Sequence, residues 1–325
     1  MKLPRRQFLH LAAGATLLPA VSRPSWAQVY PARPVRVIVG FTPGGGNDIV
    51  ARLIGQWLSE RLGQPFVIEN RPGAGSNIGT QAVANAPPDG YTLLLCGTTN
   101  AINETYYQKL SFSFVRDIAP ISSITLQPQV MLAHPSFAAK SLAELITYAK
   151  ANPDKVNMSS AGVGSIGHLA GELFKMMSGV NMVHVPFGGN SPALTALLGG
   201  QVDVSFASMP SSIEFIRTGK LRGLAVTSKA RSEALPDVPA GVETVPGYEV
   251  SAWYGVGAPK GTPAEVVEKL NKEINAGLAD AKLKARIAEF GGTPVALSPA
   301  EFGKFIADET EKWAKVIRAA NIRPL

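Results

Sequence analysis

The feature that most constrains the fold is an alternation of short, continuously apolar runs with amphipathic helical patterns. The first three runs are VRVIVGF at 35–41, PFVIEN at 65–70 and YTLLLCG at 91–97. The helical patterns between them are DIVARLIGQWLSERLG at 48–63 and SNIGTQAVANA at 76–86. Apolar strands separated by helices are typical of a parallel sheet with helices on both faces. We therefore expect an α/β protein.

Two long extended stretches, near 120–132 and 248–258, bracket a second series of strands and helices. We expect the chain to leave a first lobe through one stretch and to return through the other. This predicts a domain 1 formed by residues 28–127 and 249–325 and a domain 2 formed by residues 128–248. Each lobe would be a sheet flanked by helices, with a ligand cleft between the lobes, because domain interfaces and the carboxyl ends of parallel strands are favoured ligand positions.

Residues 1–27 have the layout of an export signal. MKLPRRQFLH is basic, the apolar run LAAGATLLPAV follows, and Ser25-Trp26-Ala27 places small residues before a cleavage site. The Arg5-Arg6 pair indicates the twin-arginine type. The apolar run has about 11 residues, whereas a membrane span needs roughly 20. We expect cleavage near Ala27 and a periplasmic location, rather than a retained anchor.

Loss of this segment would make the protein much less basic. It holds four of the 31 basic residues and no acid, which leaves 27 basic against 24 acidic residues and a net charge of +3 in place of +7. No basic cluster with interleaved aromatic residues occurs, which argues against a nucleic-acid partner. Cys96 is the one cysteine and stands in an apolar run, so we expect a buried strand cysteine without a disulfide.

Four segments share one design, in which a strand end is followed by a loop of glycines or small residues and then by a helix start. They are 41–49, 73–80, 161–168 and 187–192. Backbone N–H groups and the positive end of the helix dipole there form an anion site without a cationic side chain. A turn with a capped helix explains any single loop equally well. We expect the four loops to converge on the cleft.

The loops depart from known enzyme motifs. The glycines at 44–46 lack the Gly-Lys-Ser/Thr ending of a Walker A loop, and the glycine spacing at 73–79 is one residue longer than the dinucleotide fingerprint. A nucleophile elbow would need glycine where Val163 stands. Ser165 lies three residues before His168, so an exported serine hydrolase that uses these two residues is kept as the alternative function.

Metal binding finds no support in the pattern. His134, His168 and His184 remain after residue 27, and none pairs with another ligand type at metal-binding spacing. We therefore expect no metal and no cofactor. Asp203 stands among apolar strand residues, where a charge needs partners. A ligand ammonium, a backbone hydrogen bond or the hinge between the lobes would supply them.

Several blocks together resemble the solute receptors of tripartite tricarboxylate transporters, the Bug family. They include YPARPVRVIVGFTPGGGNDIVARLIGQWLSERLG, SAGVGSIGHLAGELFKMMSGVNMVHVPFGGNSPALTALLGGQVDVSFAS, KLRGLAVTSKARSEALPDVP and GAPKGTPAEVVEKLN. The resemblance covers essentially the whole chain after residue 27. It implies a periplasmic binding protein of the type II-like, two-lobe fold, which closes on a small carboxylate and delivers it to a membrane permease. We expect a monomer that catalyses no reaction, and docking of the loaded receptor on a signalling protein is compatible with this role.

The resemblance also implies which residues contact the ligand, because in the family a carboxylate sits on backbone N–H groups of the loops. From the first lobe these are Phe41, Thr42, Gly45, Asn47, Ser76, Asn77, Ile78, Thr98 and Asn100, and from the second they are Ser165, His168, Phe187 and Asp203.

The sequence departs from the family pattern at two places. CGTTNAINETYY is shorter than usual, with Asn100 near the usual position of a histidine and Glu104 where proline is usual. The run 187–189 is Phe-Gly-Gly where relatives carry Tyr-Lys-Gly, which removes a hydroxyl and a cation near the distal end of the ligand. We therefore expect an aromatic, monocarboxylic or dicarboxylic acid rather than a tricarboxylate.

Overall fold

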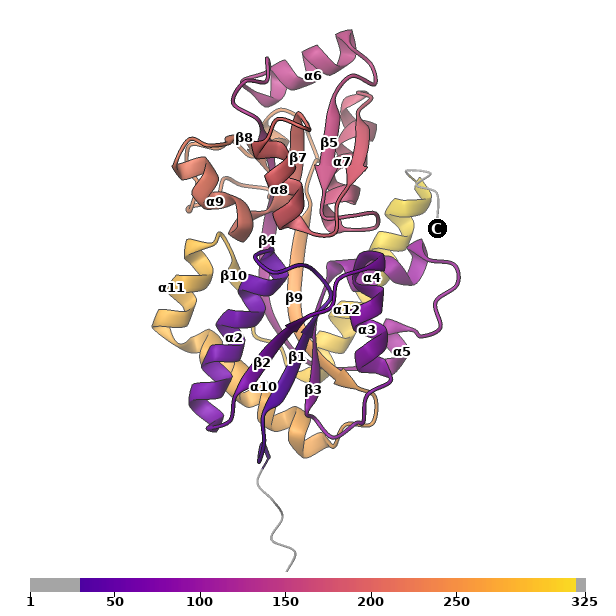
Figure 1. Cartoon of the computed structure of the whole chain (residues 1–325), viewed down its shortest axis with the longest axis vertical. Coiled ribbons are helices and arrows are strands. Elements are labelled where there is room, and N and C mark those ends of the chain that lie inside the picture. Colours follow the sequence, from indigo (N-terminus) through magenta and orange to yellow (C-terminus); the bar gives the residue numbers. More distant parts are fainter. Residues whose placement is uncertain (1–29, 320–325) are drawn as a thin grey trace, which may run out of the picture.

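Two lobes stacked along the long axis make up residues 30–319, the part of the chain that this computed structural model describes (Figure 1). The predicted export signal at 1–27 lies outside the described residues. The lobe that holds β1 to β3 is called lobe one here, and the lobe that holds β5 to β8 is called lobe two. Both lobes are α/β, as the alternating pattern predicts.

Lobe one carries its helices on both faces of the sheet, which explains why its inner strands are apolar throughout (Figure 1). Its elements are β1 (Val35–Val39), α2 (Gly46–Leu62), β2 (Phe66–Asn70), η1 (Ala74–Ser76), α3 (Asn77–Ala84), β3 (Thr92–Gly97), α4 (Thr98–Tyr106), α5 (Phe114–Asp117), α10 (Ala264–Ala279), α11 (Ala281–Glu289), β10 (Thr293–Pro294) and α12 (Pro299–Ala319).

Lobe two is smaller and repeats the same strand–helix alternation. Its elements are α6 (Leu142–Ala151), β5 (Asn157–Ser160), α7 (Ile166–Ser178), β6 (Val183–Pro186), α8 (Asn190–Leu198), β7 (Val204–Ser208), α9 (Met209–Arg217), β8 (Arg222–Val226) and η2 (Gly241–Glu243).

Two long strands, β4 (Ile118–Ala133) and β9 (Ser251–Pro259), connect the lobes where the sequence predicts extended stretches (Figure 1). The strand order is β2-β1-β3-β9-β4-β7-β5-β6, with β8 and β10 also paired to β4. β4 pairs antiparallel with β9 up to Pro128 and with β7 from Gln129 onward. One strand therefore serves both lobes. The domain boundaries given above stay a prediction.

Parallel pairing places the site-forming loops. β1 is parallel to β2 and β3, and β5 is parallel to β6 and β7. The carboxyl ends of both sets lie at the boundary between the lobes (Figure 1). Every loop that follows one of these strands therefore starts at this boundary.

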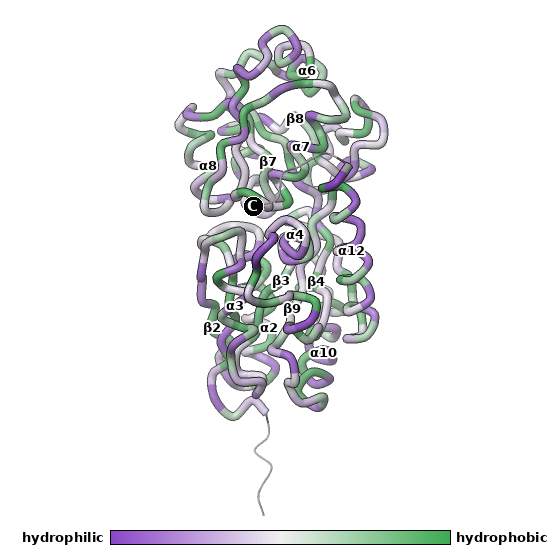
Figure 2. Tube along the Cα trace, turned by 90° about the vertical axis from the view of Figure 1, so that its right-hand side faces the viewer, coloured by the Kyte–Doolittle hydropathy of each residue, from purple (hydrophilic) through white to green (hydrophobic). Residues whose placement is uncertain are grey.

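Burial follows the sequence pattern closely. Leu93, Leu94 and Leu95 are buried on β3, and Cys96 is a free, buried strand cysteine as expected. The strands are largely hydrophobic, and hydrophilic stretches lie mainly on the outer helices and turns (Figure 2). α2 ends at Leu62 and is followed by Gly63, which has a left-handed backbone with φ 70° and donates its N–H to the carbonyl of Ser59.

Candidate ligand site

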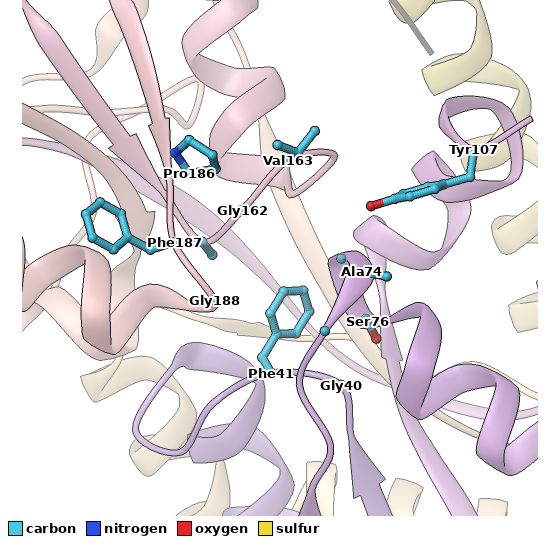
Figure 3. Close-up of a pocket in the computed structure, with 13 residues that line it drawn as sticks. Gly40, Phe41, Ala74, Ser76, Tyr107, Gly162, Val163, Pro186, Phe187 and Gly188 are labelled. Atoms are coloured by element: carbon cyan, nitrogen blue, oxygen red, sulfur yellow. The ribbon is translucent and has the colours of Figure 1, made fainter. Parts of the chain in front are cut away.

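A cavity of about 290 Å³ lies between the lobes at the facing strand ends (Figure 3). All four glycine-rich loops contribute to it. Its lining consists of Gly40, Phe41, Gly73, Ala74, Gly75, Ser76, Tyr107, Ala161, Gly162, Val163, Pro186, Phe187 and Gly188. Within this lining only Ser76 and Tyr107 have side chains with a hydrogen-bonding atom, and no lining side chain is charged. An anionic ligand would therefore depend on hydroxyl and backbone N–H groups.

The loop at 73–76 has a backbone suited to hold an anion. All four residues have positive φ, namely 132° at Gly73, 46° at Ala74, 60° at Gly75 and 79° at Ser76. Such values cost about 1 kcal/mol or more at residues other than glycine, and they persist only where the surroundings impose them. Glycines with positive φ let a ligand approach the backbone closely, and the N–H groups of such a turn can bind an anion. The start of α3 directly behind this loop adds the positive end of a helix dipole.

A buried amide network holds this strained loop in place. The Nδ2 of Asn103 donates to the carbonyl of Gly75 at 2.7 Å and to the Oδ1 of Asn77 at 2.8 Å. The Thr80 hydroxyl donates to the carbonyl of Ser76 at 2.9 Å and accepts from the Nδ2 of Asn100 at 2.8 Å. Asn77 and Asn100 thus support the loop from behind. Asn103, which the sequence analysis missed, makes the most direct contact.

The first loop, at 41–46, is anchored by Asp48. This buried carboxylate accepts from the Gly44 N–H at 2.9 Å, from Arg52 at 2.8 and 2.9 Å, and from Asn70 at 3.0 Å. Asn70 also donates to the carbonyl of Phe41 at 3.0 Å. Burial alone would raise the pKa of Asp48, but the hydrogen bonds from these partners outweigh it and hold the pKa below its ordinary value.

Replacing Asp48 with alanine should destabilise the protein by about 2–4 kcal/mol, because a buried carboxylate and four hydrogen bonds are lost together. The free energy of unfolding in urea measures this. Asp308→Ala is the matched control, since Asp308 also pairs with a basic residue one helical turn away but is 62% exposed. An Asp48 variant no less stable than the Asp308 variant would contradict the anchoring role.

The structure brings only part of the predicted set to the cavity. Phe41, Ser76 and Phe187 line it. The Phe41 ring points into the space from lobe one, whereas the Phe187 ring is directed away from Phe41 and packs against the apolar core of lobe two (Figure 3). Thr42 and Gly45 lie at a neighbouring contact between the lobes, close to Gly189 and Asn190.

The other predicted residues of lobe one lie outside the lining. Asn47 is half-buried in the first turn of α2, and Ile78 is 53% exposed on α3. The Thr98 hydroxyl accepts from the backbone N–H of Trp253 at 2.8 Å. The Oδ1 of Asn100 accepts from the backbone N–H of Gly97 at 2.8 Å and so caps α4. The Thr98 and Asn100 side chains therefore already have hydrogen-bond partners within lobe one and its connecting strand.

Asp203 is placed at the wrong end of its strand for a ligand contact. It directly precedes β7, and its carboxylate accepts from the Asn157 N–H at 2.7 Å at the start of β5. The cavity lies at the other end of these strands, beyond Ser160 and Ser208. Of the partners weighed from sequence, the backbone hydrogen bond is the one observed.

Ser165 and His168 form a helix cap rather than a nucleophile–base pair. The Ser165 hydroxyl accepts from the backbone N–H of His168 at 3.2 Å, and the ring Nδ1 of His168 accepts from Gly164 at 3.2 Å. Among the described residues, no hydrogen bond joins the Ser165 hydroxyl to the His168 ring, which a serine nucleophile would need. The geometry therefore gives the hydrolase alternative no support.

His168 also stacks on His184, with ring centroids 4.0 Å apart and an interplanar angle of 16°. The Nε2 of His184 lies 2.7 Å from the Ser160 hydroxyl. Burial lowers the pKa of His168 to about 4 and that of His184 to about 3. Both rings are therefore neutral at pH 7. The edge of the Tyr106 ring, from lobe one, faces His168 with centroids 6.3 Å apart.

Within residues 30–319, no helix is both long and apolar enough to cross a bilayer. The same residues contain no group of three His, Cys, Asp or Glu side chains placed to hold a metal ion.

Two α/β lobes joined by two strands, with a cavity at their facing strand ends, define a two-lobe ligand-binding protein. Known structures share this arrangement. BugD, described as a periplasmic binding protein, is 35% identical with a TM-score of 0.88 over 91% of this chain and 100% of that one. A protein of R. palustris solved with adipate is 38% identical with a TM-score of 0.89 over 91% and 100%. MatC from Rhodopseudomonas palustris, with bound malate, is 33% identical with a TM-score of 0.84 over 89% and 100%.

Sequence comparison agrees with the structural matches. The model of the tripartite tricarboxylate transporter family receptor matches residues 50–322. Protein BugT of Bordetella pertussis is 39% identical over 301 residues, which is 92% of both chains. The chain therefore belongs to the tripartite tricarboxylate transporter receptor family and has the fold of periplasmic binding proteins. The resemblance drawn from the sequence blocks is confirmed.

Proposed function

We propose that the protein is an extracytoplasmic receptor that captures a small carboxylate between its lobes and delivers it to a membrane permease of the tripartite tricarboxylate type. The observation that carries this proposal is the uncharged cavity between the lobes, which is lined by the glycine-rich loop at 73–76 with its four positive φ values. The backbone N–H groups of such a loop at a helix start can hold an anion. The relatives solved with adipate and malate support a carboxylate as the ligand class.

The cavity favours an acid with few charges. Phe41, Val163, Pro186 and Phe187 are apolar, and no cationic side chain lines the space. Each further carboxylate buried there would lack a charged partner, so the cost rises with the number of charges and is largest for a tricarboxylate. The ligand is therefore an aromatic, monocarboxylic or dicarboxylic acid, and a tricarboxylate such as citrate should bind worse.

Capture requires that the lobes move. The proposed moving bodies are domain 1 (28–127 with 249–325) and domain 2 (128–248), with the hinge in the paired strands β4 and β9. The hydrogen bond from the Ser191 hydroxyl to the carbonyl of Pro43, at 2.7 Å, joins the two lobes here and would break when they open. We also propose that the protein is periplasmic, with its signal peptide removed near Ala27, and that it is a monomer.

A thermal-shift panel of carboxylic acids tests this function. A carboxylic acid that the folded protein binds, present at 100 times its dissociation constant, should raise the free energy of unfolding by about 2.7 kcal/mol. This corresponds to a rise in Tm of roughly 5 °C. The neutral amides of the same acids serve as controls and should shift Tm less. If no mono-, di- or aromatic carboxylate in a broad panel stabilises the protein, or if citrate stabilises it most, the proposal is wrong in ligand class.

A further inference from the structure

The side chain of Tyr107 is held at the cavity by its neighbours. Tyr107 follows the last residue of α4, and its ring packs edge-on against Tyr106 with centroids 5.5 Å apart. Figure 3 shows the ring reaching across the cavity mouth with its hydroxyl directed inward. Tyr107 and Ser76 are the two lining residues whose side chains can donate a hydrogen bond.

The Tyr107 hydroxyl lies directly over the loop at 73–76. A Cβ on Gly75 would sit 3.3 Å from this hydroxyl and 3.1 Å from the carbonyl oxygen of Val163 in lobe two. Glycine at this position, with its φ of 60°, therefore leaves room for both groups to approach the loop. The Tyr107 hydroxyl and the Val163 carbonyl of lobe two therefore both lie next to Gly75 in the loop at 73–76.

The hydroxyl is also available as a donor. It makes no hydrogen bond to any described residue, although the side chain is half-buried. Burial raises the pKa of Tyr107, so the hydroxyl keeps its proton over the whole physiological pH range. An anion held on the N–H groups of the loop at 73–76 would lie within reach of this proton.

We propose that Tyr107 donates a hydrogen bond to the ligand carboxylate and so determines the preference for an acid over its neutral analogue. This inference rests on the proposed function and adds a side-chain donor to the backbone N–H groups. Hydrogen bonds to charged acceptors are stronger than those to neutral ones, so the contribution of Tyr107 should be larger for the acid than for the amide.

Titration calorimetry of the Tyr107→Phe variant tests the inference, with the best-binding acid of the panel and its amide as probes. The variant should bind the acid about 10- to 100-fold more weakly than the wild type and should lose a smaller factor for the amide. The Tm of the free variant should match the wild type, because the hydroxyl has no hydrogen-bond partner among residues 30–319. Tyr106→Phe is the matched control, since Tyr106 is the adjacent tyrosine and does not line the cavity, and it should bind the acid like the wild type.

The outcomes separate the two proposals. If the wild type binds the acid and Tyr107→Phe binds it equally well, Tyr107 is not a donor, while the receptor function stands. If the variant loses the same factor for acid and amide, the Tyr107 hydroxyl does not distinguish the charged ligand from the neutral one, and the inference is wrong. If the wild type binds no carboxylate, the proposed function fails and the inference fails with it.

Discussion

Replacing Gly189 with alanine should hold the lobes apart and weaken ligand binding by about tenfold or more. A Cβ at this position would lie 2.1 Å from the Thr42 hydroxyl and 3.3 Å from the Thr42 Cβ and N atoms. Gly189 belongs to lobe two and Thr42 to the first loop of lobe one, so the added methyl group would clash across the boundary between the lobes. The φ of 159° at Gly189 also strains any residue other than glycine within lobe two, and the Tm of the free variant measures that separate effect. Loss of even 1.4 kcal/mol of closure energy reduces affinity tenfold.

Small-angle scattering with saturating ligand, together with calorimetry, measures both effects. The wild type should become more compact on binding, whereas the Gly189→Ala variant should not. Gly199→Ala is the control at the other end of α8, because a Cβ there would meet its nearest atom at an ordinary 3.4 Å. A Gly189 variant that compacts and binds like the wild type would show that closure does not bring these two loops together.

Lowering the pH should destabilise the protein, because folding holds the stacked rings of His168 and His184 in their neutral form. Both rings are neutral in the folded protein at pH 7, because burial lowers the pKa to about 4 for His168 and about 3 for His184. The unfolded chain binds protons on these side chains near pH 6.5. Their stabilising contribution is therefore complete above pH 6.5 and is lost as pH falls toward 4. The loss by pH 4 should be about 2–3 kcal/mol for each histidine.

Unfolding in urea at several pH values between 7 and 4 measures this slope. The double variant His168→Gln, His184→Gln removes both titrating rings, so its stability should fall less over the same window. Carboxylates with low pKa, such as Asp48, add to the slope in both proteins and cancel in the difference. Parallel curves for the wild type and the double variant would contradict the assignment.

The fold could be predicted from the sequence because its signals are local. Runs such as VRVIVGF on β1, and the terminating Gly63 of α2, indicate strands and helix ends without tertiary information. The four loops were also found, because glycine-rich turns after strands are visible in the chain. Their convergence follows from parallel pairing, which places all such loops at one edge of a sheet.

The details of the site could not be predicted because they depend on side chains that meet across elements. Asp48 and Asn103 carry no motif, and only the structure shows that their hydrogen bonds hold the first and second loops. Asp203 was misplaced because an apolar strand pattern does not reveal which end a flanking residue occupies. Tyr107 was missed because it follows a helix end, where no sequence signal marks it as facing a cavity.

One departure from the family pattern has a structural reason. Glu104, which stands where proline is usual, accepts from the backbone N–H groups of Phe114 and Val115 at the start of α5. Its carboxylate also accepts from the Ser113 hydroxyl at 3.2 Å. The Glu104 carboxylate therefore caps α5 and does not line the cavity.

The cavity should hold a carboxylate and release it chemically unchanged. Isothermal titration of the wild type with its best-binding acid, and with the neutral amide of that acid, measures this. We expect one acid per chain, an affinity at least about tenfold above that of the amide, and full recovery of the acid after denaturation. Equal binding of the amide, or conversion of the acid to a product, would show that the protein is not a carboxylate receptor.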